Sequence, residues 1–464
     1  MRIERDTHGE AAIEDQAYYG LQTIRALENF PILRQPIHHD LVAALVQIKK
    51  AAVLTNISHH FIDPEIGRAI NQACDEVLAG ALADQFVVDA FQGGAGTSAN
   101  MNVNEVLANR ALEILGHGKG DYDRIHPIDH VNLFQSTNDV FPTAVRIAAI
   151  NRLKSVSENF ARLQTALQAK EQEFSTILKV GRTQLQDAVP VTLGQEFGAW
   201  SQAIARDRWR IYKVEERLRQ VNIGGTAVGT GINAPRKYLF TMIDKLREVT
   251  GLGLARAEYL MDATQNNDVF VEVSGLLKTA AVSLTKIAND LRLLASGPRA
   301  GFGEIRLPPL QSGSSIMPGK VNPVMPEAVN QVAYQIMAND LAITLAAQGG
   351  QLELNAFLPL IAHNLLQMLD LLDHVIPLFI DKCIQGIEAD RARCQQLLDG
   401  STAIVTALTG YIGYDRAAAI AVESLATGES VRSLLVQQGL LTEEQLVRIL
   451  QPETMTSPGI PGSK

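Results

Sequence analysis

Apolar side chains that recur every three or four residues over long stretches constrain this chain more than any other feature. One such stripe runs through Leu153, Val156, Phe160, Leu163, Leu167 and Phe174. Two later stripes run through Ala280, Leu284, Ile287, Leu291 and Leu294 and through Leu365, Leu369, Leu372 and Ile376. This spacing is typical of helices that pack lengthwise on other helices. The sequence therefore predicts a mainly α fold with a long helical bundle.

Shorter helical patterns lie on both sides of these stripes. A pattern begins near Leu41, and another runs from Ile66 to Val77. After about residue 390, glycines divide the chain into short helical stretches, and residues 454–464 are rich in Pro, Gly and Ser. We expect three domains: an N-terminal helical domain at 1–138, a central helical bundle at 139–392 and a small C-terminal helical domain at 393–464.

Composition excludes several classes of partner. The 464 residues are 46% apolar, which is enough for an extensive core, and the net charge of −9 argues against a nucleic-acid partner. Neither a membrane-spanning run nor a hydrophobic signal core at Met1–Asp6 is evident, so we expect no membrane association. The three cysteines, Cys74, Cys383 and Cys394, form no C-x-x-C pair and indicate unpaired thiols in a reducing cytoplasm.

Residues 311–323 are predicted to form a loop between two of the helical patterns. They contain three serines, two prolines, two glycines, Lys320 and Asn322. Gly and Pro break regular structure, and the hydroxyls, the cation and the amide suit a small anionic substrate. An ordinary surface turn is an alternative. A nucleotide P-loop is disfavoured because five residues separate Gly313 from Gly319 and Val321 stands where Ser or Thr must hold magnesium.

Three other segments are rich in small polar residues, at 92–102, 135–139 and 181–190. The first also satisfies the dinucleotide pattern G-x-G-x-x-G/A, with Glu113 as the ribose acid, but the surrounding βαβ alternation is absent. The second favours a helix N-cap or a turn, and the third a polar turn. His126 and His130 have the i,i+4 spacing of a metal pair, but Pro127 lies between them, so we expect a surface or capping role.

Together these segments resemble a known family. Residues 313–323, Gly-Ser-Ser-Ile-Met-Pro-Gly-Lys-Val-Asn-Pro, resemble the signature loop of the aspartase/fumarase superfamily, and the three polar segments resemble the regions that meet this loop there. The resemblance runs from Tyr18 to about Tyr414. Residues 93–98, Gln184 and residues 324–327 are similar to the aspartase branch, whereas residues 108–111 and 355–357 are closer to class II fumarases.

The resemblance implies a three-domain aspartase/fumarase fold and a lyase. In the aspartase branch the reaction is the reversible deamination of L-aspartate to fumarate and ammonia, by abstraction of a Cβ proton through an aci-carboxylate intermediate. Fumarate hydratase (class II fumarase) is the second hypothesis, and a non-enzymatic structural protein on the same scaffold is the third. The resemblance also implies a homotetramer in which three subunits build each active site. We expect no cofactor and no metal site, and the departure at Ile128 argues against the second anion site of fumarases.

The resemblance assigns a role to each candidate site residue. Ser314 matches the family's catalytic base, and its weak hydroxyl needs backbone N–H groups of the loop and Lys320 to favour the alkoxide. The expected ligands of the β-carboxylate are Thr97, Ser136, Thr137 and Ser315. The expected ligands of the α-carboxylate are Thr183, Lys320 and Asn322. Asn138, with Gln184 or Thr97, is expected to orient the ammonium. The loop is predicted to close over substrate.

Overall fold

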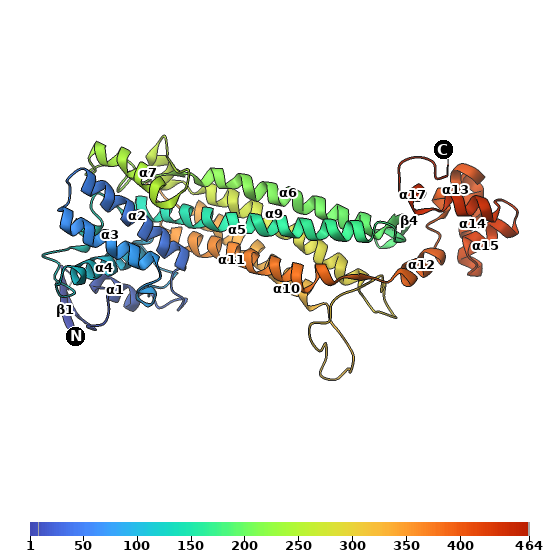
Figure 1. The fold of residues 1–464 in the computed structure, drawn as a ribbon, viewed down its shortest axis with the longest axis horizontal. Coiled ribbons are helices and arrows are strands. Elements are labelled where there is room, and N and C mark those ends of the chain that lie inside the picture. The colour runs from blue at the N-terminus through green and yellow to red at the C-terminus, as the bar shows by residue number, and fades with distance from the viewer. Residues whose placement is uncertain (8, 463–464) are drawn as a thin grey trace. The chain divides into compact units, whose positions relative to one another are not determined.

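The computed structural model describes residues 1–7 and 9–462 and is mainly α, as predicted (Figure 1). The helices are α1 (Leu21–Asn29), α2 (His39–Ser58), α3 (Pro64–Leu78), α4 (Thr97–Ile114), α5 (Thr137–Glu173), α6 (Leu193–Leu218), α7 (Arg236–Thr250), α8 (Leu260–Gln265), α9 (Asp268–Leu294), α10 (Val324–Gln348), α11 (Leu358–Lys382), α12 (Arg391–Asp399), α13 (Val405–Ile412), α14 (Tyr414–Thr427), α15 (Val431–Gln437), α16 (Glu443–Ile449) and α17 (Pro452–Met455). The strands are β1 (Arg2–Asp6), β2 (Gly9–Ile13), β3 (Leu178–Thr183), β4 (Gln186–Thr192), β5 (Gln220–Val221), β6 (Ala255–Arg256), β7 (Ile305–Arg306) and β8 (Glu388–Ala389).

The chain forms two compact units. Unit 1 comprises Met1–Ser157, Trp209–Thr279 and Tyr334–Asp373, and unit 2 comprises Glu158–Arg208, Ala280–Ala333 and His374–Lys464. The long helices α5, α6, α9, α10 and α11 each contribute one part to each unit. The three-domain division expected from the sequence follows different boundaries and stays a prediction.

The predicted apolar stripes fall on α5, α9 and α11, with Phe174 directly after the end of α5, and their residues are buried. Burial of these side chains is what stabilises the long helices, because intrinsic propensity alone contributes little. The sequence missed the β1–β2 and β3–β4 hairpins, and it missed helix α1.

In unit 1, helix α2 packs against α3 and α7, and α4 packs against α1 and α3. Among the described residues, α2 is the helix that is long and apolar enough to cross a membrane by length and composition. However, 67% of its apolar window is buried. Its apolar character is therefore accounted for by its place in the core of this unit.

In unit 2, the β3–β4 hairpin is anchored by a buried ionic cluster. Glu304 is 0% exposed and lies 3.2 Å from Lys179 Nζ and 3.1 Å from an Nη atom of Arg182. Lys179 also pairs with Glu196 at 2.7 Å. The C-terminal helices α13 to α16 share a hydrophobic core that includes Val180 of β3. The hairpin is thus held in place by charge pairing at its base and by apolar packing.

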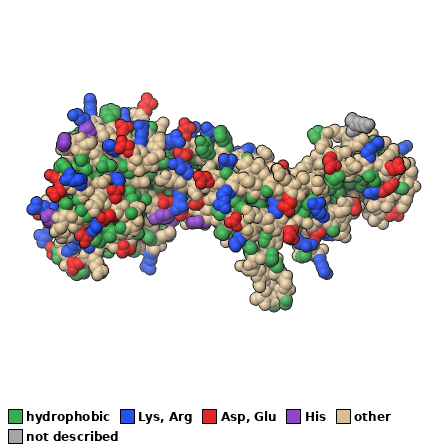
Figure 2. Space-filling model, in the orientation of Figure 1, with side chains coloured by type: hydrophobic (Ala, Val, Ile, Leu, Met, Phe, Trp, Pro, Cys, Tyr) green, Lys and Arg blue, Asp and Glu red, His purple; other side chains and the backbone are tan. Residues whose placement is uncertain are grey.

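The distribution of surface charge and the state of the cysteines both follow what the sequence indicated. Over the face shown in Figure 2, the described Lys and Arg side chains are interspersed with Asp and Glu side chains. Cys74, Cys383 and Cys394 are free and buried, which confirms the prediction of unpaired thiols, and burial raises the pKa of each to about 12.

Candidate functional site

The N-terminus of α5 carries three of the predicted substrate ligands. Ser136 Oγ accepts a hydrogen bond from the backbone N–H of Asn138 at 3.2 Å, and the N–H of Ser136 donates to Asp139 Oδ1 at 3.0 Å. This reciprocal arrangement is a helix N-cap, one of the two alternatives that the sequence favoured. Because the N-terminal end of a helix is electropositive, Ser136, Thr137 and Asn138 lie where a carboxylate is stabilised.

Helix α4 meets α5 at this end of unit 1. Asn100 Nδ2 donates to Thr137 Oγ1 at 3.1 Å, and Thr97, the first residue of α4, donates its hydroxyl to the carbonyl of Gly94 at 2.8 Å. Gly96 has φ +96°, and a Cβ there would lie 2.3 Å from the ring of Phe141. The approach of the two helices therefore requires glycine at this position.

Asp139 binds the backbone of a second segment, residues 224–226, at the N-terminus of α5. Its buried Oδ2 accepts from the N–H groups of Gly224 and Thr226, both at 3.0 Å, and Asn138 Nδ2 donates to the carbonyl of Ala227 at 2.7 Å. Burial raises the pKa of Asp139 to about 6, although the backbone N–H donors act in the opposite direction. The glycine-rich segment that follows Asn222 thus lies against the N-terminus of α5.

Lys49 of α2 lies beneath this network, and sequence reasoning missed it. It is 0% exposed, and its Nζ donates to Asn132 Oδ1 at 2.8 Å and to Gln135 Oε1 at 3.0 Å. Burial lowers the pKa of Lys49 to about 7. The signal was present in the sequence, because Lys49 stands on the apolar face of its helix, four residues after Leu45 and four before Val53.

The loop of residues 311–323 lies in unit 2 between β7 and α10. Ser314 Oγ accepts hydrogen bonds from the backbone N–H groups of Ile316 at 3.1 Å and Met317 at 3.0 Å. Two donors directed at one hydroxyl oxygen favour negative charge on it. Ser315 and Lys320 are exposed, and the side chain of Ile316 is 83% exposed. The loop therefore presents its polar groups to solvent and directs backbone dipoles at Ser314.

The neck of this loop is closed by Gly313 and Asn322. Gly313 N–H donates to the carbonyl of Lys320 at 2.8 Å, and Asn322 Nδ2 donates to the carbonyl of Gly313 at 2.7 Å. A Cβ on Gly313 would lie 2.4 Å from the Lys320 carbonyl oxygen. The hydrogen bond from Asn322 thus fixes the base of the loop, and residue 313 must be glycine because the backbone of Lys320 passes close to it.

Thr183 and Gln184 lie at the tip of the β3–β4 hairpin. Thr183 pairs with Gln186, and Gln184 and Leu185 have φ +56° and +61°, as in a type I′ turn. Thr183 and Gln184 are exposed, whereas Arg182 below them reaches the buried Glu304. The sequence predicted a polar turn here but not the strands on either side of it.

The structure brings the predicted residues together in three groups. In unit 1, Thr97, Ser136, Thr137 and Asn138 gather at the N-termini of α4 and α5. In unit 2, Ser314, Ser315, Lys320 and Asn322 share one loop, and Thr183 and Gln184 share the hairpin tip. Figure 1 shows that hairpin and the loop before α10 at separate places in unit 2. One copy of unit 2 therefore does not place Thr183 beside Ser314.

The histidines have the capping role that the sequence predicted. His126 Nδ1 accepts from the N–H groups of Ile128 and Asp129, both at 3.2 Å, and His130 Nδ1 accepts from the N–H of His126 at 2.9 Å.

Elsewhere, ligand atoms of His38, His39 and Asp40 lie within 4.8 Å of one another.

The His38–His39–Asp40 cluster is already engaged in ion pairs. Arg152 pairs with Asp40, and His38 Nε2 lies 2.7 Å from Asp370 Oδ2. His38 Nδ1 also accepts the backbone N–H of Asp40 at 3.1 Å. A guanidinium thus supplies the positive charge in this cluster, and both ring nitrogens of His38 are occupied by protein groups.

Comparison with known protein families covers most of the chain. Residues 9–338 match the lyase family, and residues 404–457 match the fumarase C C-terminus family. The curated relatives include the aspartate ammonia-lyase of Bacillus subtilis (strain 168), which is 50% identical over 463 residues and covers 100% of this chain and 98% of its own length. The aspartate ammonia-lyase of Helicobacter pylori (strain ATCC 700392 / 26695) is 48% identical over 460 residues, with 99% and 98% covered.

Solved structures show the same fold. A fumarate lyase:delta crystallin from Brucella melitensis, bound to cobalt, superimposes with a TM-score of 0.96 at 50% identity and covers 98% of this chain and 100% of that one. A recombinant class II fumarase from Schistosoma mansoni has a TM-score of 0.93 at 35% identity, with 98% and 99% covered. Both structures share the mainly α fold of this chain.

Proposed function

The chain belongs to the lyase family of the aspartase/fumarase superfamily, and we propose that it is an aspartate ammonia-lyase. It is a carbon–nitrogen lyase that converts L-aspartate reversibly to fumarate and ammonia. Identity near one half over the full chain to proteins of that name, against 35% to a class II fumarase, favours ammonia over water as the leaving group.

Proton abstraction is assigned to Ser314, and the observation that carries this assignment is the pair of backbone N–H groups directed at its Oγ. A serine hydroxyl is too weak a base unless its alkoxide is stabilised, and these dipoles act on that oxygen. The alkoxide takes the proton from Cβ, and the electron pair moves into the β-carboxylate to give the aci-carboxylate. That pair then returns to form the double bond of fumarate as the bond between Cα and nitrogen breaks.

Charge on the β-carboxylate grows during this step, so donors fixed around it lower the barrier. We assign these contacts to Thr97, Ser136, Thr137 and Ser315. The electropositive N-terminus of α5 supports the assignment of Ser136 and Thr137, because it stabilises anions.

The other end of the substrate carries a carboxylate and an ammonium. We assign the α-carboxylate to Thr183, Lys320 and Asn322, of which Lys320 supplies the charge. Asn138, with Gln184 or Thr97, orients the ammonium, which already carries its proton and leaves without a strong general acid. The hydrogen bond from Asn138 to Ala227 supports a fixed orientation for this amide.

We further propose a homotetramer in which three subunits build each active site. The separation of the Thr183 hairpin from the Ser314 loop within unit 2 supports this proposal, since a second copy is needed to bring the two together. Ile316, Met317 and Val321 of the loop are exposed apolar residues, as expected for a segment that is covered during the reaction. The buried, unpaired thiols support a cytoplasmic location.

One assay tests the proposed function. The absorbance of fumarate is followed with L-aspartate and, separately, with L-malate as the only substrate. The proposal expects fumarate from L-aspartate and little from L-malate. The reverse result would identify a hydratase, and the absence of fumarate from both substrates would leave a structural protein on this scaffold.

A further inference from the structure

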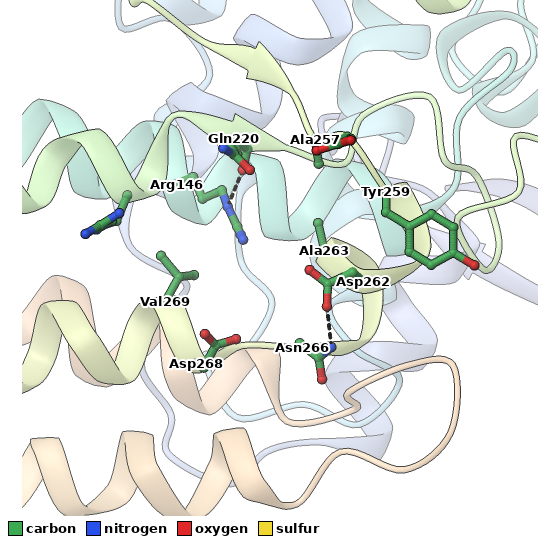
Figure 3. A pocket seen from close by; sticks show the side chains of 11 residues that line it. Arg146, Gln220, Ala257, Tyr259, Asp262, Ala263, Asn266, Asp268 and Val269 are labelled. Carbon is green, nitrogen blue, oxygen red and sulfur yellow. Dashed lines mark hydrogen bonds between the residues drawn. The ribbon is translucent and has the colours of Figure 1, made fainter.

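Unit 1 contains a cavity of about 710 Å³ that none of the residues assigned to the substrate lines. Its walls come from α5, α6, β5, α8, the start of α9 and the segment before α8 (Figure 3). Arg217 of α6 is a second cation among the lining residues, and it pairs with Glu272 at 3.3 Å. Its volume lies within the range of small-molecule sites, roughly 300–1,000 Å³. The cavity is therefore large enough to hold a metabolite.

Arg146 of α5 is the buried polar group that points into this cavity (Figure 3). The residue is 4% exposed, its Nε donates to the carbonyl of Gln220 at 2.9 Å, and its guanidinium lies 5.0 Å from the centre of the Phe270 ring. Among the described residues, its Nη1 has no hydrogen-bond partner. A buried guanidinium N–H without an acceptor is costly, so Arg146 has donor capacity that the protein groups around it leave unsatisfied.

Carboxylates line the facing wall of the same cavity. Asp262 and Asp268 point toward the space in front of Arg146, and Asp262 Oδ1 accepts from Asn266 Nδ2 at 2.6 Å (Figure 3). No direct ion pair between Arg146 and either carboxylate is found among the described residues, although both are close enough to raise the pKa of Arg146 against the effect of burial. The guanidinium of Arg146 and the carboxylates of Asp262 and Asp268 thus face each other across the cavity.

We propose that this cavity binds a small zwitterion of the α-amino-acid type, with its carboxylate on Arg146 and its ammonium on Asp262 and Asp268. An anion alone would place its charge near the carboxylates of Glu258, Asp262 and Asp268. A cation alone would leave the guanidinium of Arg146 without an acceptor. A molecule that carries both charges a few atoms apart satisfies both walls, and the remaining volume accommodates its side chain.

The test uses the assembled enzyme without turnover, so that its outcome is separate from that of the proposed function. Isothermal titration compares three probes: glycine as the zwitterion, acetate as the anion and methylamine as the cation. Glycine is expected to bind with a Kd of about 1 mM, and acetate and methylamine about 10-fold more weakly.

Variants place the binding in this cavity. Arg146→Met and Asp268→Asn are each expected to weaken glycine binding about 10-fold, whereas Asp244→Asn, an exposed aspartate of α7 outside the cavity, leaves it unchanged. Asp268 is exposed, so its variant tests the proposal even if Arg146→Met fails to fold. Turnover of L-aspartate by the Asp268→Asn variant at the wild-type rate would show that the proposed active site is intact.

Three results would overturn the proposal. Equal affinity for glycine and acetate would show that the acidic wall takes no part. Glycine binding that survives both Arg146→Met and Asp268→Asn would place the ligand elsewhere. Failure of all three probes to bind would show that the cavity holds only water.

Discussion

Lys49 donates a hydrogen bond from its buried ammonium to Asn132 Oδ1 at 2.8 Å, and the same oxygen accepts from Asn100 Nδ2 at 3.2 Å. Asn100 also donates to Thr137 Oγ1 at 3.1 Å. Because Thr137 Oγ1 accepts from Asn100, the proton of its hydroxyl is free to donate to a substrate carboxylate. A network that begins at a buried lysine therefore orients a hydroxyl of the proposed site.

Replacement of Asn100 tests this orientation. Asn100→Ala leaves Thr137 free to rotate, so kcat/KM for L-aspartate is expected to fall about 10- to 100-fold. Steady-state fumarate formation measures the effect. Asn104→Ala is the matched control, because Asn104 is a buried asparagine on the same helix whose Nδ2 donates to Met101. An equal loss in the two variants would point to a general packing effect and contradict the proposed role of Asn100.

The buried ammonium of Lys49 makes stability depend on pH. Burial lowers its pKa from 10.5 to about 7, so between these values the unfolded chain binds a proton that the folded chain does not. The free energy of unfolding therefore rises with pH across this window, by at most about 5 kcal/mol for one lysine. Asp139, with a pKa raised to about 6, titrates below the window.

Lys49→Met is expected to remove this slope. Urea unfolding of the wild type and the variant at about pH 7.5 and about pH 9.5 gives the comparison. The wild type should gain stability at the higher pH by more than the variant does. Identical gains in the two proteins would mean that Lys49 is charged in the folded state throughout the window.

Glu304 is expected to be essential for the position of the β3–β4 hairpin. Glu304→Gln leaves the cations of Lys179 and Arg182 without their buried carboxylate, a change that costs about 3–5 kcal/mol of stability. Because Thr183 follows Arg182, the KM for L-aspartate should also rise. Thermal unfolding and initial rates measure the two effects. Glu388→Gln, an exposed glutamate of β8, is the control and should change neither quantity.

Gly96 is expected to tolerate no side chain. In Gly96→Ala the new Cβ meets Phe141 at 2.3 Å, whereas in Gly94→Ala the nearest atom is 3.8 Å away, although both glycines have positive φ. The first variant should be less stable than the second by about 1–3 kcal/mol, which is the cost of overpacking. Denaturant midpoints measure the difference. Equal stabilities would mean that backbone strain, not the contact between α4 and α5, determines the need for glycine.

Helices and loops with a strong local pattern could be predicted from the sequence. The stripe from Leu153 to Phe174 predicted α5, and the Ser-, Gly- and Pro-rich run at 311–323 predicted the loop before α10. These features depend on spacing and backbone preference, which neighbouring residues determine.

Features that depend on tertiary contacts could not be predicted in this way. The β3–β4 hairpin turns at Gln184 and Leu185, which are not the Asn-Gly or Asp-Gly pair that marks a type I′ turn, so its strands gave little signal. Lys49 and Arg146 are buried by segments that lie far away in the chain. Whether each of their N–H groups has a hydrogen-bond partner also depends on those segments. Charged side chains are mostly exposed, so composition alone argues against burying either one.

The rate of fumarate formation from L-aspartate by Ser314→Ala tests the central claim most directly. Ser312→Ala, a change to an exposed serine in the same loop, is the control. If Ser314 is the base, Ser314→Ala should retain the wild-type fold by circular dichroism and lose turnover by about 1,000-fold or more, while Ser312→Ala stays near the wild-type rate. Turnover of a folded Ser314→Ala enzyme at a rate close to the wild type would contradict the account.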